Sequence, residues 1–267
     1  MDNRAFKDEF GPVALVTGAS SGIGKSFAGV LASMGMDLVL VARRRQRLED
    51  LATRLRERYG VQVTLCQVDL AQSGASGQIL DSTAKLDVGL VVSNAGFGIK
   101  AEHAASDPQA MTDMLMVNCH VPMLLSHGFI PRLRARGKGG IIFTSSVEGL
   151  LGCPYSAAYS ASKAMVVSLG EALWGELTPE GIKILTLCPG PTDTEAAALQ
   201  GMDTAKMEGL MSPDDVARLT LENIDNGPTF VSHPRYKAMF ERMLAMPRRD
   251  VLAASAKALK ALISPTG

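Results

Sequence analysis

Seven short apolar runs, rich in β-branched residues, alternate with longer segments of helical periodicity along most of the chain. Continuously apolar runs are typical of strands that helices cover on both faces. A strand–helix–strand repeat also makes neighbouring strands parallel, because the chain crosses over through a helix before the next strand begins. The sequence therefore predicts an α/β fold, a single doubly wound domain over residues 1–267 with a parallel, seven-stranded sheet. Its strands are expected at residues 13–17, 37–41, 61–68, 88–93, 140–144, 182–187 and 229–231.

Three segments have the periodicity of long helices. Residues 44–59 place leucines on one face and charged residues on the other, which predicts an amphipathic helix that covers the sheet. Residues 108–136 and 157–177 carry apolar side chains around much of their circumference, more than packing on one sheet face requires. This excess indicates either a thick core or a subunit interface, and we expect a homo-oligomer, a dimer or a tetramer.

The regular alternation loosens after about Thr194. Six of the 14 methionines lie between Met202 and Met246, and adaptable methionine side chains suit apolar binding surfaces. We therefore expect residues 194–250 to cover the substrate. Residues 249–264 have roughly helical apolar spacing, so we expect a C-terminal helix that docks on its own chain, on a partner subunit or on a membrane surface.

The charge balance and the cysteine spacing exclude several classes of function. Lys and Arg number 27, and Asp and Glu also number 27, so the chain lacks the basic excess of nucleic-acid-binding proteins. The first ten residues lack the apolar run of a signal peptide, and no stretch approaches the ~18 consecutive apolar residues of a membrane span. The four cysteines lie far apart, without metal-ligand spacing. We expect a cytoplasmic protein with reduced thiols and no metal.

A glycine-rich turn connects the first predicted strand to a helix and has the sequence TGASSGIG over residues 17–24. Glycines at such a turn let the backbone bend sharply and approach a pyrophosphate, which then lies at the positive end of the helix. This favours a dinucleotide site in a Rossmann-type fold, although the glycine spacing differs from G-x-G-x-x-G.

Two other motifs overlap the same turn. Residues 18–22 match G-x-S-x-G, the nucleophile turn of hydrolases, whose histidine partner could be any of the four histidines. Residues 19–26 differ by one position from the phosphate-binding loop G-x4-G-K-[ST], because Ala19 stands where the first glycine should be. A serine hydrolase and a P-loop nucleotide hydrolase are therefore alternatives.

Three further features occur at specific spacings. An Asn-Ala-Gly motif at residues 94–96 ends the fourth predicted strand, Ser146 follows the fifth, and Tyr159 precedes Lys163 by four residues. Together with the glycine-rich turn, they resemble the classical short-chain dehydrogenase/reductase family over about residues 11–195. In that family the serine also lies 13 residues before the tyrosine, as it does here. The resemblance implies a Rossmann-type fold and an oxidoreductase that uses a nicotinamide cofactor.

The chemistry of carbonyl reduction explains these residue types. A hydride must come from a cofactor, because no side chain can supply one, and a proton must reach the substrate oxygen. Tyr159 is the expected general acid and base, and Lys163, one helical turn away, would stabilise its phenolate and reach the nicotinamide ribose. Ser146 would hold the substrate oxygen by a hydrogen bond. By resemblance, Asn118 would position a water that passes protons to Lys163.

The end of the second predicted strand indicates the cofactor. An acidic residue there binds the ribose 2′-hydroxyl of NAD, whereas this strand ends in the sequence VARR. Arginine pairs with a 2′-phosphate, so we predict NADP(H), with Arg43 as the first candidate ligand, Arg44 as the second and Ser20 in support. By resemblance, Asp69 would bind the adenine amino group and Thr194 the carboxamide. The full set of predicted cofactor contacts is Gly18, Ser20, Ser21, Gly22, Ile23, Gly24, Arg43, Arg44, Asp69, Leu70, Asn94, Ala95, Gly96, Tyr159, Lys163, Pro189, Gly190, Thr192 and Thr194.

We expect a small, lipophilic carbonyl or alcohol substrate. The methionine-rich segment and two leucines that follow the serine, Leu150 and Leu151, favour a 3-oxoacyl thioester, a steroid or another hydrophobic ketone. The expected reaction is NADPH-dependent reduction to a secondary alcohol. A non-catalytic NADP(H)-sensing protein on the same fold is a further alternative.

Overall fold

Seven strands form one sheet in which every neighbouring pair is parallel. The computed structural model describes residues 3–196 and 209–263. The strand order is β3-β2-β1-β4-β5-β6-β7, so the order reverses between β1 and β4, where α/β sheets bind ligands beyond the carboxyl ends of their strands. The strands are β1 (Val13–Thr17), β2 (Asp37–Ala42), β3 (Val63–Gln67), β4 (Val88–Ser93), β5 (Gly139–Thr144), β6 (Ile182–Leu187) and β7 (Thr229–Phe230).

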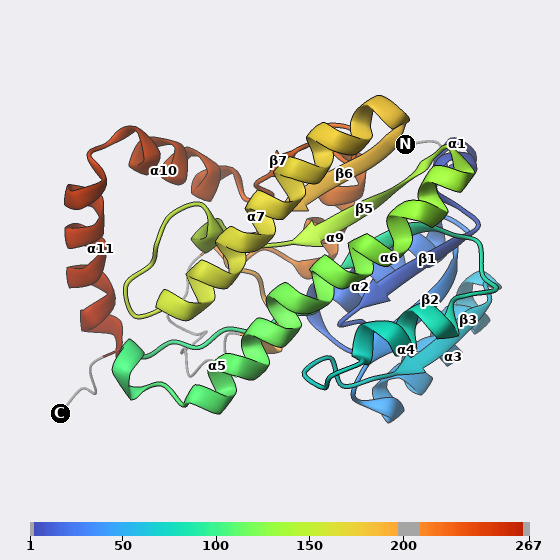
Figure 1. The fold of residues 1–267 in the computed structure, drawn as a ribbon, viewed down its shortest axis with the longest axis horizontal. Helices are drawn as coiled ribbons and strands as arrows, with labels where there is room; N and C mark the ends of the chain where they lie inside the picture. The colour runs from blue at the N-terminus through green and yellow to red at the C-terminus, as the bar shows by residue number, and fades with distance from the viewer. Residues whose placement is uncertain (1–2, 197–208, 264–267) are drawn as a thin grey trace.

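Each face of the sheet has its own layer of helices, because successive side chains of a strand point to opposite faces. In β1, Ala14 and Val16 pack with α1, α2, α3 and α9. On the other face, Val13 and Leu15 belong to the core that α4, α6 and α7 cover, and α6 and α7 cross in front of the sheet in Figure 1. The helices on the two faces are α1 (Asn3–Phe10), α2 (Gly22–Ser33), α3 (Arg45–Tyr59), α4 (Ala75–Ser82), α5 (Pro108–Leu115), α6 (Val121–Arg136), α7 (Ala157–Leu177) and α9 (Pro213–Glu222).

The predicted doubly wound α/β domain with a parallel, seven-stranded sheet is confirmed. The amphipathic helix expected at residues 44–59 is α3, whose buried leucines face the sheet. The prediction of a single helix over residues 108–136 was wrong in detail, because a π-helical turn, η2 (Met116–His120), separates α5 from α6. The π-helical turn contains Asn118, one of the predicted site residues.

The C-terminal helices α10 (Pro234–Ala245) and α11 (Arg248–Ile263) lie beside the loop that joins β5 to α7 (Figure 1). Val251 of α11 is buried in a small cluster with Phe240 of α10 and Val147 of that loop. The C-terminal helix therefore docks on its own chain. Of the predicted covering segment, residues 197–208 lie outside the described residues. Within the described ranges, no helix is long and apolar enough to cross a membrane.

Candidate active site

The glycine-rich turn and the Asn-Ala-Gly motif are held together at the carboxyl ends of β1 and β4. Asn94 donates from its backbone nitrogen to Thr17 Oγ1 at 3.0 Å and from Nδ2 to the Thr17 carbonyl at 3.1 Å. Gly18 has φ +69°, and a Cβ there would lie 2.9 Å from the Cα of Ala95. A side chain at Gly24 would collide with the Gly18 carbonyl. The glycines therefore permit a close turn that ends at the start of α2.

Gly96, at the end of the Asn-Ala-Gly motif, lies between two polar side chains. A Cβ at this position would be 2.9 Å from Lys163 Nζ and 3.1 Å from Asn118 Oδ1. Asn118 is only 1% exposed, donates from Nδ2 to the Phe97 carbonyl at 2.9 Å and to Ser162 Oγ at 3.0 Å, and accepts from the Phe97 backbone nitrogen at 3.1 Å. Asn118 therefore anchors the loop after β4 next to Lys163.

Ser146, Tyr159 and Lys163 converge at the carboxyl end of β5. Tyr159 and Lys163 lie in the first two turns of α7, and Lys163 Nζ is 5.8 Å from the centroid of the Tyr159 ring. Lys163 is 3% exposed and donates to the Thr144 carbonyl at 2.8 Å. Ser146 accepts from the Glu148 backbone nitrogen at 3.1 Å and shares a hydrogen bond with Tyr159. The structure thus brings together the three residues that the sequence analysis placed in catalysis.

Burial has the largest effect on the pKa values of Tyr159 and Lys163. It raises the pKa of Tyr159 above its ordinary value, the Glu148 carboxylate raises it further, and the hydrogen bond with Ser146 opposes both. Burial also lowers the pKa of Lys163 to about 8. Tyr159 therefore keeps its proton at neutral pH, which suits a group that donates a proton to a substrate oxygen.

A charged pair beside Tyr159 was missed by the sequence analysis. Lys100 donates to the carboxylate of Glu148 and, at 3.1 Å, to Ser156 Oγ. Its Nζ lies 5.7 Å from the centroid of the Tyr159 ring. Both charged side chains are largely buried, and Glu148 Oε2 is a buried oxygen without a hydrogen-bond partner among the described residues. The two residues lie in separate loops 48 positions apart, so no local pattern connects them.

Arg44 is the arginine that contacts the glycine-rich turn. It donates from Nη2 to Ser20 Oγ at 3.0 Å and to Ser21 Oγ at 2.7 Å, and from Nε to Ser20 Oγ at 3.2 Å. Arg43 is exposed, and its backbone carbonyl accepts from Gln67 Nε2 at 3.3 Å. The geometry favours Arg44, the second candidate from the sequence, at the end of β2.

The segment after β6 contacts both the loop that carries Ser146 and the glycine-rich turn. Pro189 accepts a backbone hydrogen bond from Val147, next to Ser146, at 3.2 Å. A Cβ on Gly22, which has φ +52°, would lie 3.1 Å from Thr194 Cγ2. Within the segment, Thr192 Oγ1 donates to the Gly190 carbonyl at 3.0 Å.

The other predicted cofactor contacts are less distinctive. Asp69 follows β3 and accepts from the Ala71 backbone nitrogen at 3.1 Å, and Leu70 beside it is buried. Ile23 is partly buried against the core. Because all strands are parallel, the ends of β1 to β6 place the predicted residues along one edge of the sheet.

The geometry gives no support to the two hydrolase interpretations of the turn. A serine nucleophile needs a base that takes its proton, whereas Ser20 is bound by the guanidinium of Arg44, which can only donate. A phosphate-binding loop uses free backbone N–H groups, whereas the Ala19 N–H donates to the Val41 carbonyl at 3.2 Å.

Comparisons with known proteins identify the family of this chain. The sequence model of the short chain dehydrogenase family matches residues 12–204. The chain is 28% identical over 249 residues to a 7beta-hydroxysteroid dehydrogenase of Clostridium sardiniense, an alignment that covers 93% of this chain and 95% of the relative. It is 35% identical over 184 residues to a very-long-chain 3-oxoacyl-CoA reductase of Phaeosphaeria nodorum, covering 66% of this chain but only 54% of that longer protein.

A solved structure supports the same relation. The structure of a short-chain dehydrogenase from Sphingobium yanoikuyae in complex with NADPH superposes with a TM-score of 0.80 at 29% sequence identity, over 96% of this chain and 97% of the other. The family match spans most of the described chain, including the glycine-rich turn and the serine, tyrosine and lysine at the carboxyl end of β5. The chain therefore belongs to the classical short-chain dehydrogenase/reductase family.

Proposed function

We propose that the protein is an NADPH-dependent carbonyl reductase that converts a hydrophobic ketone to a secondary alcohol. The convergence of Ser146, Tyr159 and Lys163 beside the glycine-rich turn carries this proposal. The similarity to hydroxysteroid and 3-oxoacyl-CoA enzymes supports a lipophilic substrate. The four free cysteines favour a reducing compartment and hence the cytoplasm.

The residues at the sheet edge fit NADPH. The positive-φ glycines let a pyrophosphate approach the start of α2, where unpaired N–H groups and the helix dipole favour an anion. At the end of β2, Arg44 with Ser20 and Ser21 offers a guanidinium and two hydroxyls to a ribose 2′-phosphate. NADPH, when bound, supplies the hydride.

The protein's own side chains donate the proton to the substrate and take part in its return. Ser146 donates a hydrogen bond to the substrate oxygen and Tyr159 transfers its proton to the same atom. The phenolate that remains is stabilised by Lys163, whose ammonium lies one helical turn away. Asn118 holds the loop after β4 against Lys163, and we propose that it also positions the water through which the proton returns. These steps require a protonated Tyr159, in agreement with the raised pKa of its hydroxyl.

Replacement of Arg44 tests the cofactor assignment. Arg44→Ala is expected to weaken NADPH binding about tenfold or more, because a charge-assisted contact contributes about 1.5–3 kcal/mol. NADH binding should change little, since its ribose carries no 2′-phosphate. Cofactor fluorescence titrations measure both constants. Arg43→Ala is the matched variant. A larger loss of NADPH affinity in Arg43→Ala than in Arg44→Ala would assign the phosphate to Arg43. If neither variant loses NADPH affinity selectively, the NADP(H) preference is contradicted.

The buried pair Lys100–Glu148 is expected to shift the pH dependence of the reverse reaction, in which Tyr159 must lose its proton. Glu148→Gln removes a carboxylate that raises the pKa of Tyr159, so the pH profile of alcohol oxidation should move to lower pH. Lys100→Met leaves that carboxylate without its cation and should move the profile to higher pH. The kcat of NADP⁺ reduction, measured from pH 6 to 11, checks both shifts, with the exposed Glu102→Gln as control. If the pH profiles of both variants move in the same direction, the charges of Lys100 and Glu148 do not control the pKa of Tyr159.

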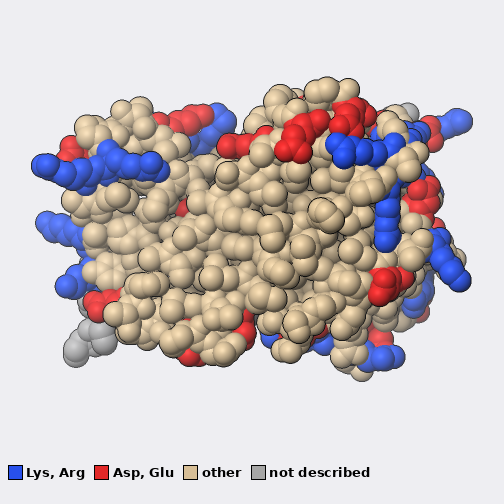
Figure 2. Space-filling view, in the orientation of Figure 1, with Lys and Arg blue, Asp and Glu red and all other residues tan. Residues whose placement is uncertain are grey.

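We also propose that the protein forms a homo-oligomer through the face of α5, α6 and α7. Figure 2 shows that charged side chains lie mainly around the rim of this face, and Leu115, Met123 and Leu124 are exposed on it. The double variant Met123→Glu/Leu124→Glu is expected to sediment as a monomer, while the wild type sediments as a dimer or tetramer. Leu244→Glu on α10 should leave the assembly unchanged. A monomeric wild type would overturn the proposal.

A further inference from the structure

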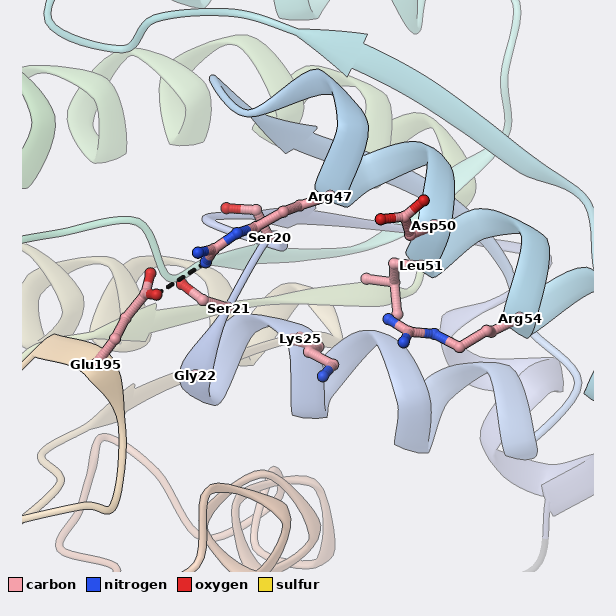
Figure 3. A pocket seen from close by; sticks show the side chains of 9 residues that line it. All are labelled: Ser20, Ser21, Gly22, Lys25, Arg47, Asp50, Leu51, Arg54 and Glu195. Atoms are coloured by element: carbon pink, nitrogen blue, oxygen red, sulfur yellow. Dashed lines mark hydrogen bonds and ion pairs between the residues drawn. The ribbon is translucent and has the colours of Figure 1, made fainter.

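Glu195 connects the segment after β6 to the glycine-rich turn and to α3. Its carboxylate accepts from Arg44 Nη2 at 2.5 Å and from Arg47 Nη1 at 2.8 Å. In Figure 3, Glu195 and Arg47 reach toward each other from separate elements, and Ser21 lies beside their contact. The contact between Glu195 and Arg47 spans 148 positions in the sequence, so it fixes the segment after β6 against α3.

The guanidinium of Arg44 can bind an anion, and in this structure the anion that it binds is the carboxylate of Glu195. Its guanidinium is oriented by the hydroxyls of Ser20 and Ser21 and pairs with Glu195 at the same time. The hydrogen bond from Arg44 holds the pKa of Glu195 at about 2, so the carboxylate is ionised throughout the physiological pH range. These same donors are the ones that the proposed function assigns to the ribose 2′-phosphate. Two anions at one set of donors repel each other, so a phosphate at Arg44 has to displace Glu195.

Resting on the proposed NADP(H) site, we propose that Glu195 is a specificity-determining residue that competes with the 2′-phosphate for Arg44 and Arg47. It weakens the binding of NADP(H), because the phosphate must first displace the carboxylate. It leaves NAD(H) binding almost unchanged, because a ribose 2′-hydroxyl carries no charge and does not need the guanidinium. Glu195 thereby reduces the NADP(H) preference that Arg44 alone would create.

The surroundings allow the carboxylate to move without losing every cationic partner. A cavity of about 320 Å³ adjoins the contact and lies between α2 and α3. Three basic side chains line this cavity, Lys25, Arg47 and Arg54, together with the carboxylate of Asp50 (Figure 3). The side chain of Glu195 is 34% exposed, so its displacement requires no repacking of the core.

Glu195→Gln tests the competition, because it keeps the shape of the side chain and removes its charge. The Kd of NADPH is expected to fall about tenfold, and that of NADH to stay within twofold, since relief of a like-charge contact affects only the phosphorylated ribose. The fragments 2′,5′-ADP and 5′-AMP are probes that differ in the 2′-phosphate alone, and titration calorimetry measures all four constants. Glu49→Gln is the matched control, since Glu49 pairs with Arg45 on the same helix at 2.7 Å. It should leave the ratio of the two nucleotide affinities unchanged.

The double variant Arg44→Ala/Glu195→Gln separates this inference from the proposed function. If the two residues act through each other, Glu195→Gln gives a much smaller gain in NADPH affinity once Arg44 is absent, because only the competition at Arg47 remains. If NADPH and 2′,5′-ADP bind in an Arg44-dependent way but Glu195→Gln changes neither constant, the competition is refuted and the cofactor site stands. If no variant and no wild-type protein binds NADPH, the proposed function itself fails.

Discussion

Tyr159→Phe is expected to lower kcat for ketone reduction by about 10²–10⁴-fold, the usual contribution of a positioned general acid. The phenyl ring fills the same space at the start of α7 but cannot transfer a proton to the substrate oxygen. NADPH affinity should stay within about threefold of wild type, because the proposed phosphate contacts lie at the glycine-rich turn and at Arg44. Initial rates of NADPH oxidation, together with a fluorescence titration of the cofactor, measure both quantities.

Tyr155→Phe is the matched control for that result. Tyr155 lies four residues before Tyr159, and its φ of 59° places it in a tight turn just before α7. The hydroxyl of Tyr155 has no assigned part in catalysis, so this variant should keep most of the wild-type kcat. A Tyr159→Phe enzyme that retains the wild-type rate, or a Tyr155→Phe enzyme that loses it, would contradict the assignment of the proton donor.

The pH dependence of stability is expected to reveal the buried lysine. Burial lowers the pKa of Lys163 from 10.5 to about 8, so the folded state releases this proton at a lower pH than the unfolded state. Between these values the unfolded chain holds the extra proton, and the free energy of unfolding therefore rises with pH. A shift of this size corresponds to about 3 kcal/mol at 1.36 kcal/mol per pH unit.

Comparison with Lys163→Met isolates that contribution. The pKa values of Tyr159 and of the buried thiol Cys188 are raised, and these groups make stability fall at high pH in both proteins. The stability of wild type relative to Lys163→Met should therefore rise by about 3 kcal/mol from pH 7 to about pH 10.5. Urea unfolding at several pH values provides the measurement, with Lys183→Met as control, because Lys183 is only partly buried and pairs with Asp225. A constant difference across this range would show that Lys163 titrates normally.

The architecture could be predicted, and the principal candidate site residues could be named, because their sequence signals are local or evenly spaced. Continuous apolar runs identify strands that are buried on both faces, and a parallel sheet then brings their carboxyl ends to one edge. The turn before α2 and the tyrosine–lysine spacing in α7 follow directly from the sequence. Residues that the topology places at the same edge, such as Asn94 and Thr17, meet without any local signal.

Other features depend on tertiary packing and have no sequence pattern. The π-helical turn at residues 116–120 adds a residue inside a segment of continuous helical periodicity, so the sequence predicts one unbroken helix there. The pair Lys100–Glu148 joins two loops. The choice between Arg43 and Arg44 depends on backbone direction where α3 begins, and the structure turns Arg44 toward Ser20.

The direction in which the pKa of Tyr159 is shifted could also not be predicted from the sequence alone. From the sequence, Lys163 is expected to favour the phenolate, because an ammonium lies one helical turn away. In the structure, burial and the Glu148 carboxylate have the larger effect and raise the pKa of the hydroxyl. The side chain therefore keeps its proton at neutral pH, and if it is the proton donor, as we propose, reduction should be the faster direction there.

Carbonyl reduction by this protein can be measured by following NADPH and product together on a panel of hydrophobic ketones, from steroids to 3-oxoacyl thioesters. We expect at least one ketone to yield its secondary alcohol in equal amount to the NADPH consumed, at a rate that Tyr159→Phe abolishes. Tight NADPH binding without turnover on any ketone would rule out the proposed reductase activity and identify the chain as a cofactor-binding protein.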